Sequence, residues 1–204
     1  VLSDYYIHSE QRYRTGYQNT RMYDRAYFAR NPSRLADAAV RRELLATILA
    51  CGPASVLDVG CGEAWLVEAL GQAGVLAWGL DPSADLGAVS RAPGRCVCGR
   101  ADALPCPDGA IDLVACIDVL QHIPEPRLGH TLRELARVGR RLLVAVDCAD
   151  PRREGHRTLH SAAWWRERCQ EVGLLVESEE GLHIGGLEVI VAARGGCQRI
   201  RGTD

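Results

Sequence analysis

Residues 55–70, "SVLDVGCGEAWLVEAL", are the most informative part of the sequence. It begins as an apolar run, stops at the carboxylate of Asp58, passes through two glycines and continues with apolar residues at helical spacing. A strand that turns through glycine into a helix is typical of a nucleotide-type site. Gly60 permits the tight turn, Gly62 lets a ligand approach the backbone, and the helix N-terminus presents N–H groups. The next strand ends about 20 residues on in Asp81, a carboxylate that can accept both ribose hydroxyls.

Strand-like and helix-like segments alternate along the rest of the chain. The predicted helices cover residues 33–51, 63–70, 84–90, 127–138 and 161–172, and the predicted strands cover residues 56–59, 75–80, 95–98, 111–116, 141–146, 174–176 and 187–192. Asn31 or Ser33 is expected to cap the first helix, and Ser161 the last. About ten residues separate the last two strands, too few for a helical crossover, so this pair is expected to be antiparallel. The pattern predicts a Rossmann-like α/β fold: a seven-stranded, mostly parallel sheet with helices on both faces and an antiparallel last strand.

The first 28 residues differ in composition from the rest. They contain all six tyrosines and the only phenylalanine, interleaved with arginines. We therefore expect two parts: a Tyr/Arg-rich appendage or lid over residues 1–31, and a core over residues 32–204. Tyr17, Tyr23 and Tyr27 are candidate substrate contacts, because tyrosine rings stack on flat or sugar-like molecules. Packing of the same rings against the core is the alternative.

Composition excludes several classes of function. The formal net charge of −2 argues against a nucleic-acid or membrane-surface binder, and no apolar run approaches the roughly 20 residues of a membrane span. The first residues lack the features of an export signal, so a cytoplasmic protein is expected. Lysine is absent, since all 24 basic residues are arginine. This excludes Schiff-base chemistry on lysine and a Walker phosphate-binding loop.

The nine cysteines favour reduced thiols over a zinc site. Their number is odd, and the only close pair, Cys96 and Cys98, is a C-x-C motif that no second pair answers. Several others lie in or beside apolar runs, where a free thiol behaves as a small hydrophobe. We expect no metal site from this pattern.

Two details at the glycine turn distinguish between ligands. A dinucleotide fold has a third glycine at the position that Trp65 occupies here. A pyrophosphate would also be repelled by Asp58, two residues before Gly60. A ligand that carries positive charge suits this turn better.

Four motifs together resemble one family. "VLDVGCGEA", "GLDPS", "GRADALPCPDGAIDLVACIDVLQHIP" and "GLLVES" occur in the order and spacing of the class I S-adenosylmethionine-dependent methyltransferases. The resemblance covers about residues 54–194. Ala64 stands where the glycine motif of the family often has another glycine, which is a mild departure.

The resemblance implies S-adenosylmethionine as the cofactor and assigns residues to it. Those that would line the methionine moiety are Asp58, Gly60 and Gly62, and Cys61 between the glycines is a further cofactor contact. Those that would contact the ribose and adenine are Asp81, Pro82, Asp102 and Ala103. Ile117 and Asp118 would face the reaction centre. Asp102 and Asp118 also fit the simpler role of helix caps.

Methyl transfer is an in-line displacement, so the protein mainly aligns the reacting atoms. An oxygen acceptor must also lose a proton, and in a chain without lysine the candidate bases are His122 and His160. His156 is a candidate substrate contact, and each histidine also fits a loop or packing role. The acceptor is expected to be a small metabolite, sugar or natural-product intermediate, methylated on oxygen, in a monomer or homodimer that binds neither nucleic acid nor membrane. The alternatives are N-methylation of a small molecule or peptide, a nicotinamide-dependent reductase, and a non-catalytic methyltransferase-like partner protein.

Overall fold

The computed structural model describes residues 34–83, 90–149, 155–178 and 181–195. The predicted appendage over residues 1–31, with Tyr17, Tyr23 and Tyr27, lies outside the described residues. So does the helix predicted at residues 84–90, except for Ser90, which is not helical.

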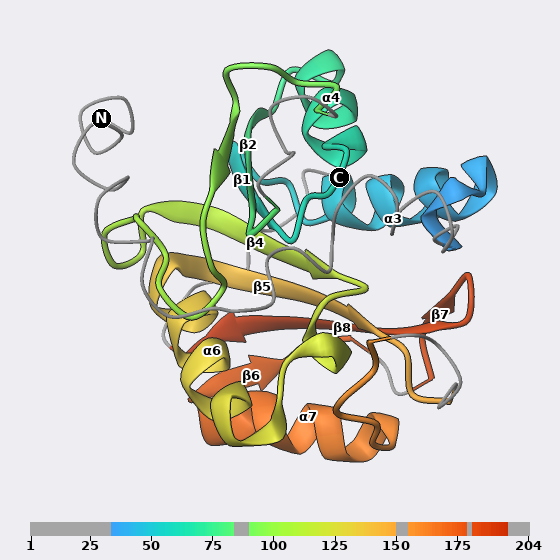
Figure 1. The fold of residues 1–204 in the computed structure, drawn as a ribbon, viewed down its shortest axis with the longest axis vertical. Coiled ribbons are helices and arrows are strands. Elements are labelled where there is room, and N and C mark those ends of the chain that lie inside the picture. Colours follow the sequence, from blue (N-terminus) through green and yellow to red (C-terminus); the bar gives the residue numbers. More distant parts are fainter. Residues whose placement is uncertain (1–33, 84–89, 150–154, 179–180, 196–204) are drawn as a thin grey trace, which may run out of the picture.

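The centre of the molecule is one sheet of eight strands (Figure 1). The strands are β1 (Ser55–Val59), β2 (Leu76–Asp81), β3 (Cys96–Cys98), β4 (Ile111–Ile117), β5 (Gly139–Val146), β6 (Leu174–Val176), β7 (His183–Ile184) and β8 (Leu187–Arg194). Their order is β3-β2-β1-β4-β5-β8-β6, and β7 pairs with β8 beside this path. The pairs are parallel except those of β8, which is antiparallel to β5, β6 and β7. The predicted mixed sheet is confirmed, with β7 as one strand more than the seven expected.

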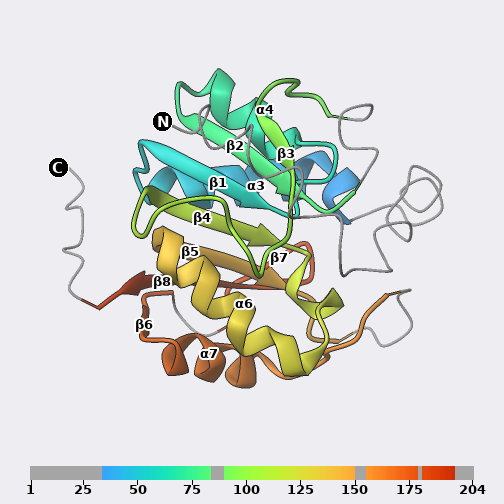
Figure 2. The same cartoon turned by 60° about the vertical axis from the view of Figure 1, so that its left-hand side comes forward.

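The helices cover both faces of this sheet, as predicted (Figure 2). The α-helices are α3 (Ala38–Ala50), α4 (Trp65–Gln72), α6 (Glu125–Val138) and α7 (Ala162–Glu171), and the 3₁₀ turns are η2 (Arg34–Ala36) and η3 (Leu120–His122). One face packs against α3 and α4, and the other against α6 and α7. No helix among the described residues is long and apolar enough to span a membrane.

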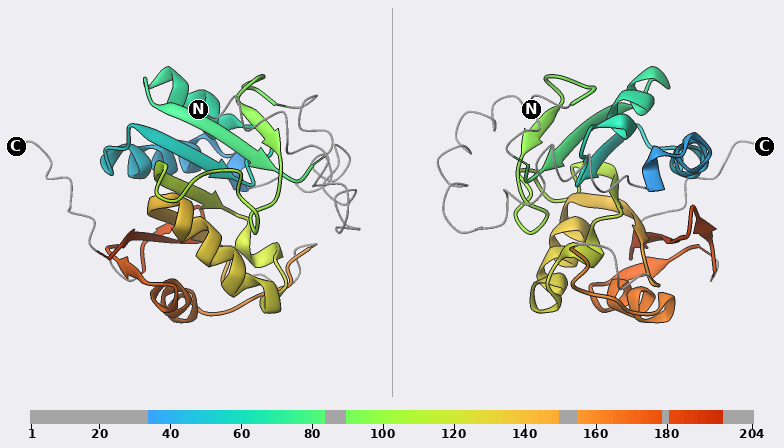
Figure 3. Two further views of the ribbon diagram at one scale, coloured as in Figure 1. Left: turned by 90° about the vertical axis from the view of Figure 1, so that its left-hand side faces the viewer. Right: turned by 45° about the vertical axis from the view of Figure 1, so that its right-hand side comes forward.

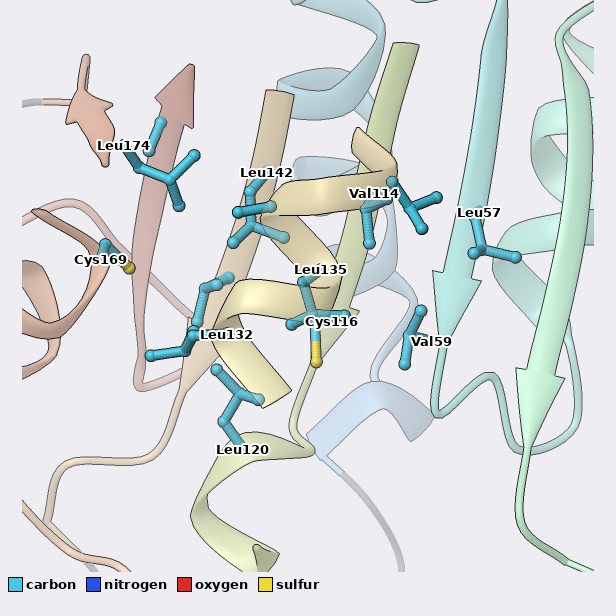
Figure 4. Packing of buried hydrophobic residues seen from close by; sticks show 14 of the residues in the cluster. Leu57, Val59, Val114, Cys116, Leu120, Leu132, Leu135, Leu142, Cys169 and Leu174 are labelled. Atoms are coloured by element: carbon cyan, nitrogen blue, oxygen red, sulfur yellow. The ribbon is translucent and has the colours of Figure 1, made fainter. Parts of the chain in front are cut away.

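Successive side chains of each strand alternate between the two faces of the sheet, so the core consists of two clusters, one on each face. In β4, Leu113 and Ala115 join the cluster under α3 and α4, while Val114 joins the cluster under α6 and α7. Successive side chains of a strand point to opposite faces, so each central strand is apolar on both sides. In the second cluster, Leu132 and Leu135 of α6 pack against the strands (Figure 4). Packing in these two clusters fixes the positions of the strand ends that form the candidate site.

The helix ends follow local capping, with one correction to the sequence prediction. α3 begins at Ala38 because the Asp37 side chain accepts the N–H of Ala39 at 2.7 Å, so the cap predicted at Asn31 or Ser33 is wrong. The cap predicted at Ser161 is confirmed, since its Oγ accepts the N–H of Trp164.

The strand order reverses beside β1. The chain runs from β1 to β2 and β3 on one side, then crosses to β4 on the other side of β1. In an open α/β sheet, ligands bind at the carboxyl ends of the strands where the order reverses in this way. Figure 3 shows these parallel strands side by side. The turn after β1 and the residues after β4 therefore meet at one edge of the sheet.

Candidate cofactor and reaction site

The glycine turn is fixed by its own backbone N–H groups. Gly60, with φ of +81°, and Cys61 both donate to the carbonyl oxygen of Leu80, at 2.7 and 3.2 Å. The N–H of Gly62 donates to Oδ2 of Asp81 at 3.0 Å. Three donors of the turn therefore face β2 and do not form a pocket for a phosphate.

Asp81 lies where the sequence placed it, at the end of β2 beside the turn. Its carboxylate is buried, and Oδ1 accepts the N–H of Ser83 at 2.8 Å. Burial raises the pKa of Asp81, and the hydrogen bonds from Ser83 and Gly62 partly offset that rise. A carboxylate has about four acceptor sites, so it can still accept ribose hydroxyls. Pro82, half-buried, follows directly.

Asp58 is the second carboxylate of the turn and is almost fully buried in β1. Burial raises its pKa to about 8, and the nearby charges of Asp81 and Cys96 contribute to the rise. Since desolvation penalises the charged form, two acids in one buried place favour a cationic ligand. This electrostatic feature agrees with the expectation drawn from the sequence.

The Cys61 side chain lies beneath the turn. Cys61 is buried, and a Cβ built on Gly79 would lie 2.6 Å from its Sγ and 2.9 Å from the Sγ of Cys96. A hydrogen bond between the two thiols raises the pKa of Cys61 and lowers that of Cys96. The side chain of Cys61 therefore packs against β2 and β3, and only its backbone belongs to the face of the turn.

Asp102 is engaged within the protein. Its carboxylate accepts hydrogen bonds from Nε and Nη2 of Arg100 at 2.8 and 2.6 Å, and it pairs with Arg127 on α6. Ala103, next to it, is exposed and donates its N–H to the carbonyl of Arg100. These contacts tie the loop to α6, and the adenine contact predicted for Asp102 and Ala103 stays a prediction.

The end of β4 carries a strained residue. Asp118 has φ of +59°, a left-handed conformation that is uncommon outside glycine and is often found at functional sites. Its N–H donates to the carbonyl of Ala145, and its Oδ1 accepts Nε2 of Gln121 at 2.6 Å. Gln121 is fully buried and was missed from the sequence, although a glutamine in an apolar turn was the available signal. Ile117, just before, is buried in the core under α3 and α4.

Two of the predicted histidines meet and the third does not. The rings of His122 and His156 contact edge to face, with centroids 4.9 Å apart. Together with Asp118 they place three potential ligand atoms within 4.8 Å of one another. His160 instead contacts Glu125 at 3.1 Å and stacks on Trp164 at 3.8 Å. Among the described residues, this is the one group of three acids, histidines or cysteines that could hold a metal ion.

Comparison with known proteins agrees with this geometry. Residues 57–142 match the methyltransferase domain family. Magnesium protoporphyrin IX methyltransferase from Synechocystis PCC 6803, solved with bound S-adenosylmethionine, is 21% identical with a TM-score of 0.61 and covers 88% of this chain and 99% of its own. Residues 57–142 therefore match a methyltransferase domain, and the described part of the chain has the fold of a known methyltransferase. The matched residues include the glycine turn, Asp81, Asp102 and Asp118 of this domain.

Two further proteins resemble the methyltransferase domain. The ubiquinone biosynthesis O-methyltransferase of Methylococcus capsulatus is 40% identical over 81 residues, which is 34% of this chain and 33% of that protein. The 1,6-didemethyltoxoflavin-N1-methyltransferase of Burkholderia thailandensis was solved with bound 1,6-didemethyltoxoflavin and S-adenosylhomocysteine. It is 16% identical with a TM-score of 0.61, and the match covers 77% of this chain and 78% of that one. The match thus spans about a third of the curated O-methyltransferase.

Proposed function

We propose that this protein transfers a methyl group from S-adenosylmethionine to a small molecule. The observation that carries the proposal is the pair of buried carboxylates, Asp58 and Asp81, at the carboxyl ends of β1 and β2. Burial, together with the nearby charge of Asp81, raises the pKa of Asp58 to about 8. The sulfonium and ammonium groups of the cofactor are cations, and they suit such a place better than a diphosphate does.

The same turn argues against the nicotinamide alternative. A dinucleotide site presents free backbone N–H groups to its pyrophosphate. Here the N–H groups of Gly60 and Cys61 bond to Leu80, and that of Gly62 bonds to Asp81. A diphosphate would therefore meet few donors from the turn and two acids beside it.

The residues present fit the methyl donor. When bound, S-adenosylmethionine supplies an electrophilic methyl group on a sulfonium leaving group. Asp81 holds Gly62 in place and would accept the ribose hydroxyls. Asp58 would release its proton when the cationic cofactor binds and so become the counter-charge. Asp118, His122 and His156 come together just beyond β4, where their side chains would hold the acceptor group beside the methyl donor.

An oxygen acceptor is the form of the reaction that we favour. The Methylococcus capsulatus relative is named an O-methyltransferase, and it shares the most identity with this chain among the three proteins compared above. The paired imidazoles beside the strand end would serve an alcohol or phenol, which must lose a proton before it attacks. N-methylation is the alternative, and the Burkholderia thailandensis enzyme is named for methylation on nitrogen in the same fold.

A transfer assay tests the proposal. The protein is incubated with S-adenosylmethionine that carries a deuterated methyl group and with a panel of phenols, sugars and amines. Mass spectrometry should detect the labelled methyl group on one class of acceptor. The Asp58→Asn variant should lose most of this transfer, whereas Asp37→Asn, which keeps an N-cap residue at an exposed position, should retain it.

Two outcomes of this assay would oppose the proposal. Binding of the donor without transfer to any acceptor class would favour the non-catalytic partner. Equal transfer by wild type and Asp58→Asn would remove the electrostatic argument. A cytoplasmic location, a monomer or homodimer, and a lid over residues 1–31 stay predictions alongside this function.

A further inference from the structure

Three side chains converge beside the cofactor turn from two separate segments. Asp118 directly follows β4, His122 ends η3, and His156 lies in the segment that leads to α7. Their carboxylate and imidazole ligand atoms all lie within 4.8 Å of one another, and all three side chains are half-buried. Solvent can therefore reach the group while the protein holds it.

Hydrogen bonds fix the two segments against each other. The carbonyl of Gln121 accepts the N–H groups of Arg157 and Thr158 at 2.8 and 3.0 Å. Oγ1 of Thr158 donates to the carbonyl of Ile123 at 2.6 Å. These bonds directly follow His156 and hold its segment beside η3, where the rings of His156 and His122 contact each other.

The carboxylate of the group is oriented as well. Asp118 is held by its N–H bond to Ala145 and by the Nε2 of Gln121, which donates to Oδ1 at 2.6 Å. A carboxylate has about four acceptor sites, so it can ligate an ion while it accepts such a bond. Outer partners of this kind are what fix the ligands of metal sites in proteins.

We propose that Asp118, His122 and His156 bind one divalent transition-metal ion, with zinc as the best match. Two imidazole nitrogens and one carboxylate oxygen suit zinc and its neighbours in the first transition row, whereas Mg²⁺ and Ca²⁺ prefer oxygen ligands alone. Ligand atoms that lie about 2.1 Å from a tetrahedral ion are roughly 3.4 Å from one another. Side-chain rotations that move these ligand atoms by about 1 Å would therefore bring them to that separation. Three protein ligands leave one position open.

The place of the ion suggests what the open position is for. Val119, next to Asp118, packs against the glycine turn: a Cβ on Gly60 would lie 2.2 Å from its Cγ2. The metal site thus borders the proposed cofactor site. If the proposed function holds, the acceptor hydroxyl would bind the ion and release its proton to solvent water. Its oxygen would then bond to the methyl carbon while the carbon–sulfur bond breaks, and S-adenosylhomocysteine would leave with the bonding electron pair.

Cobalt titration of chelator-treated protein tests the proposal, because Co²⁺ takes zinc sites and is coloured. We expect one ion per chain, displaced by Zn²⁺, with an absorption spectrum that lacks the thiolate-to-cobalt band. His122→Ala and His156→Ala should each weaken binding at least tenfold. His130→Ala, a change at an exposed histidine on α6, and Cys96→Ser should not alter binding. Thermal melting confirms that each variant is folded.

The outcomes separate this inference from the proposed function. Binding that survives both histidine substitutions, or a thiolate band that Cys96→Ser removes, would overturn the metal site. Titration of S-adenosylhomocysteine into the same metal-free sample tests the cofactor site independently. Full methyl transfer by metal-free protein would overturn the role given to the ion and leave the proposed function intact.

Discussion

Replacement of Asp58 by asparagine should make the unliganded protein more stable and its cofactor binding weaker. Asp58 is almost fully buried, and its pKa of about 8 lies far above the 3.8 of a free carboxyl group. At neutral pH the folded protein must keep a proton that the unfolded chain has released. An amide of the same shape carries no such cost.

The magnitude follows from the two pKa values. The unfolded carboxyl group ionises near pH 3.8 and the folded one near pH 8, so between these values the unfolded state binds fewer protons and stability falls as the pH rises. From pH 3.8 to pH 7 this amounts to about three pH units, or about 4 kcal/mol as an upper value. For a domain of this size, that corresponds to a rise in Tm of roughly 10 °C in the variant at pH 7.

Urea unfolding of both proteins at pH 4, 6, 7 and 9 measures the effect. The difference in the free energy of unfolding should be smallest at pH 4, grow up to pH 8 and then stay constant. Subtracting the difference measured at pH 4 removes any effect of the amide on stability that does not depend on pH. The Asp37→Asn control should follow wild type throughout. If wild type and Asp58→Asn had the same pH dependence, Asp58 would be ionised in the folded protein and the reasoning on charge would be refuted.

Three further predictions rest on single contacts. Gly60→Ala should lower the free energy of unfolding in urea by about 2–4 kcal/mol, because φ of Gly60 is +81° and a Cβ would lie 2.2 Å from Cγ2 of Val119. Gly74→Ala, at the same φ but with open space around the Cβ, should lower it by only about 1 kcal/mol. Equal losses in the two variants would contradict the clash with Val119. Arg166→Met should lower the free energy of unfolding by about 3–5 kcal/mol, because it leaves the buried Glu188 carboxylate without its guanidinium partner. Adding Glu188→Leu to this variant should restore most of that loss. A double variant as unstable as Arg166→Met would show that the lost ion pair is not the cause. At pH 7, binding of S-adenosylhomocysteine should release up to about one proton, because its ammonium group would lower the raised pKa of Asp58. Calorimetry in two buffers of different ionisation enthalpy measures this proton release. Proton uptake on binding would contradict the prediction.

Local chemistry made much of the fold predictable from the sequence. The apolar runs at β1, β4 and β5 are buried on both faces, so their continuous hydrophobicity signals a parallel sheet. The spacing of about 20 residues between the glycine turn and Asp81 was enough to predict that Asp81 lies at the end of the next strand. β7 escaped because a strand of two residues has no periodicity, although the glycines at positions 185 and 186 marked its turn into β8.

Contacts between distant segments were not readable in advance. The closeness of His156 to His122 depends on the bonds from Arg157 and Thr158 to Gln121, and no pattern within either segment encodes them. The engagement of Asp102 by Arg127 likewise depends on how α6 lies against the loop before β4. The turn after β1 and its place beside Asp81 could be predicted from the sequence because these neighbours in space also stand at a fixed spacing in the motif.

Calorimetric titration with S-adenosylhomocysteine, S-adenosylmethionine and NADH shows which cofactor the turn after β1 binds. We expect that one molecule of either sulfur cofactor binds per chain, that NADH does not compete, and that Asp81→Asn weakens binding while the protein stays folded. Binding of NADH in preference to the sulfur cofactors, or unchanged affinity in Asp81→Asn, would contradict it.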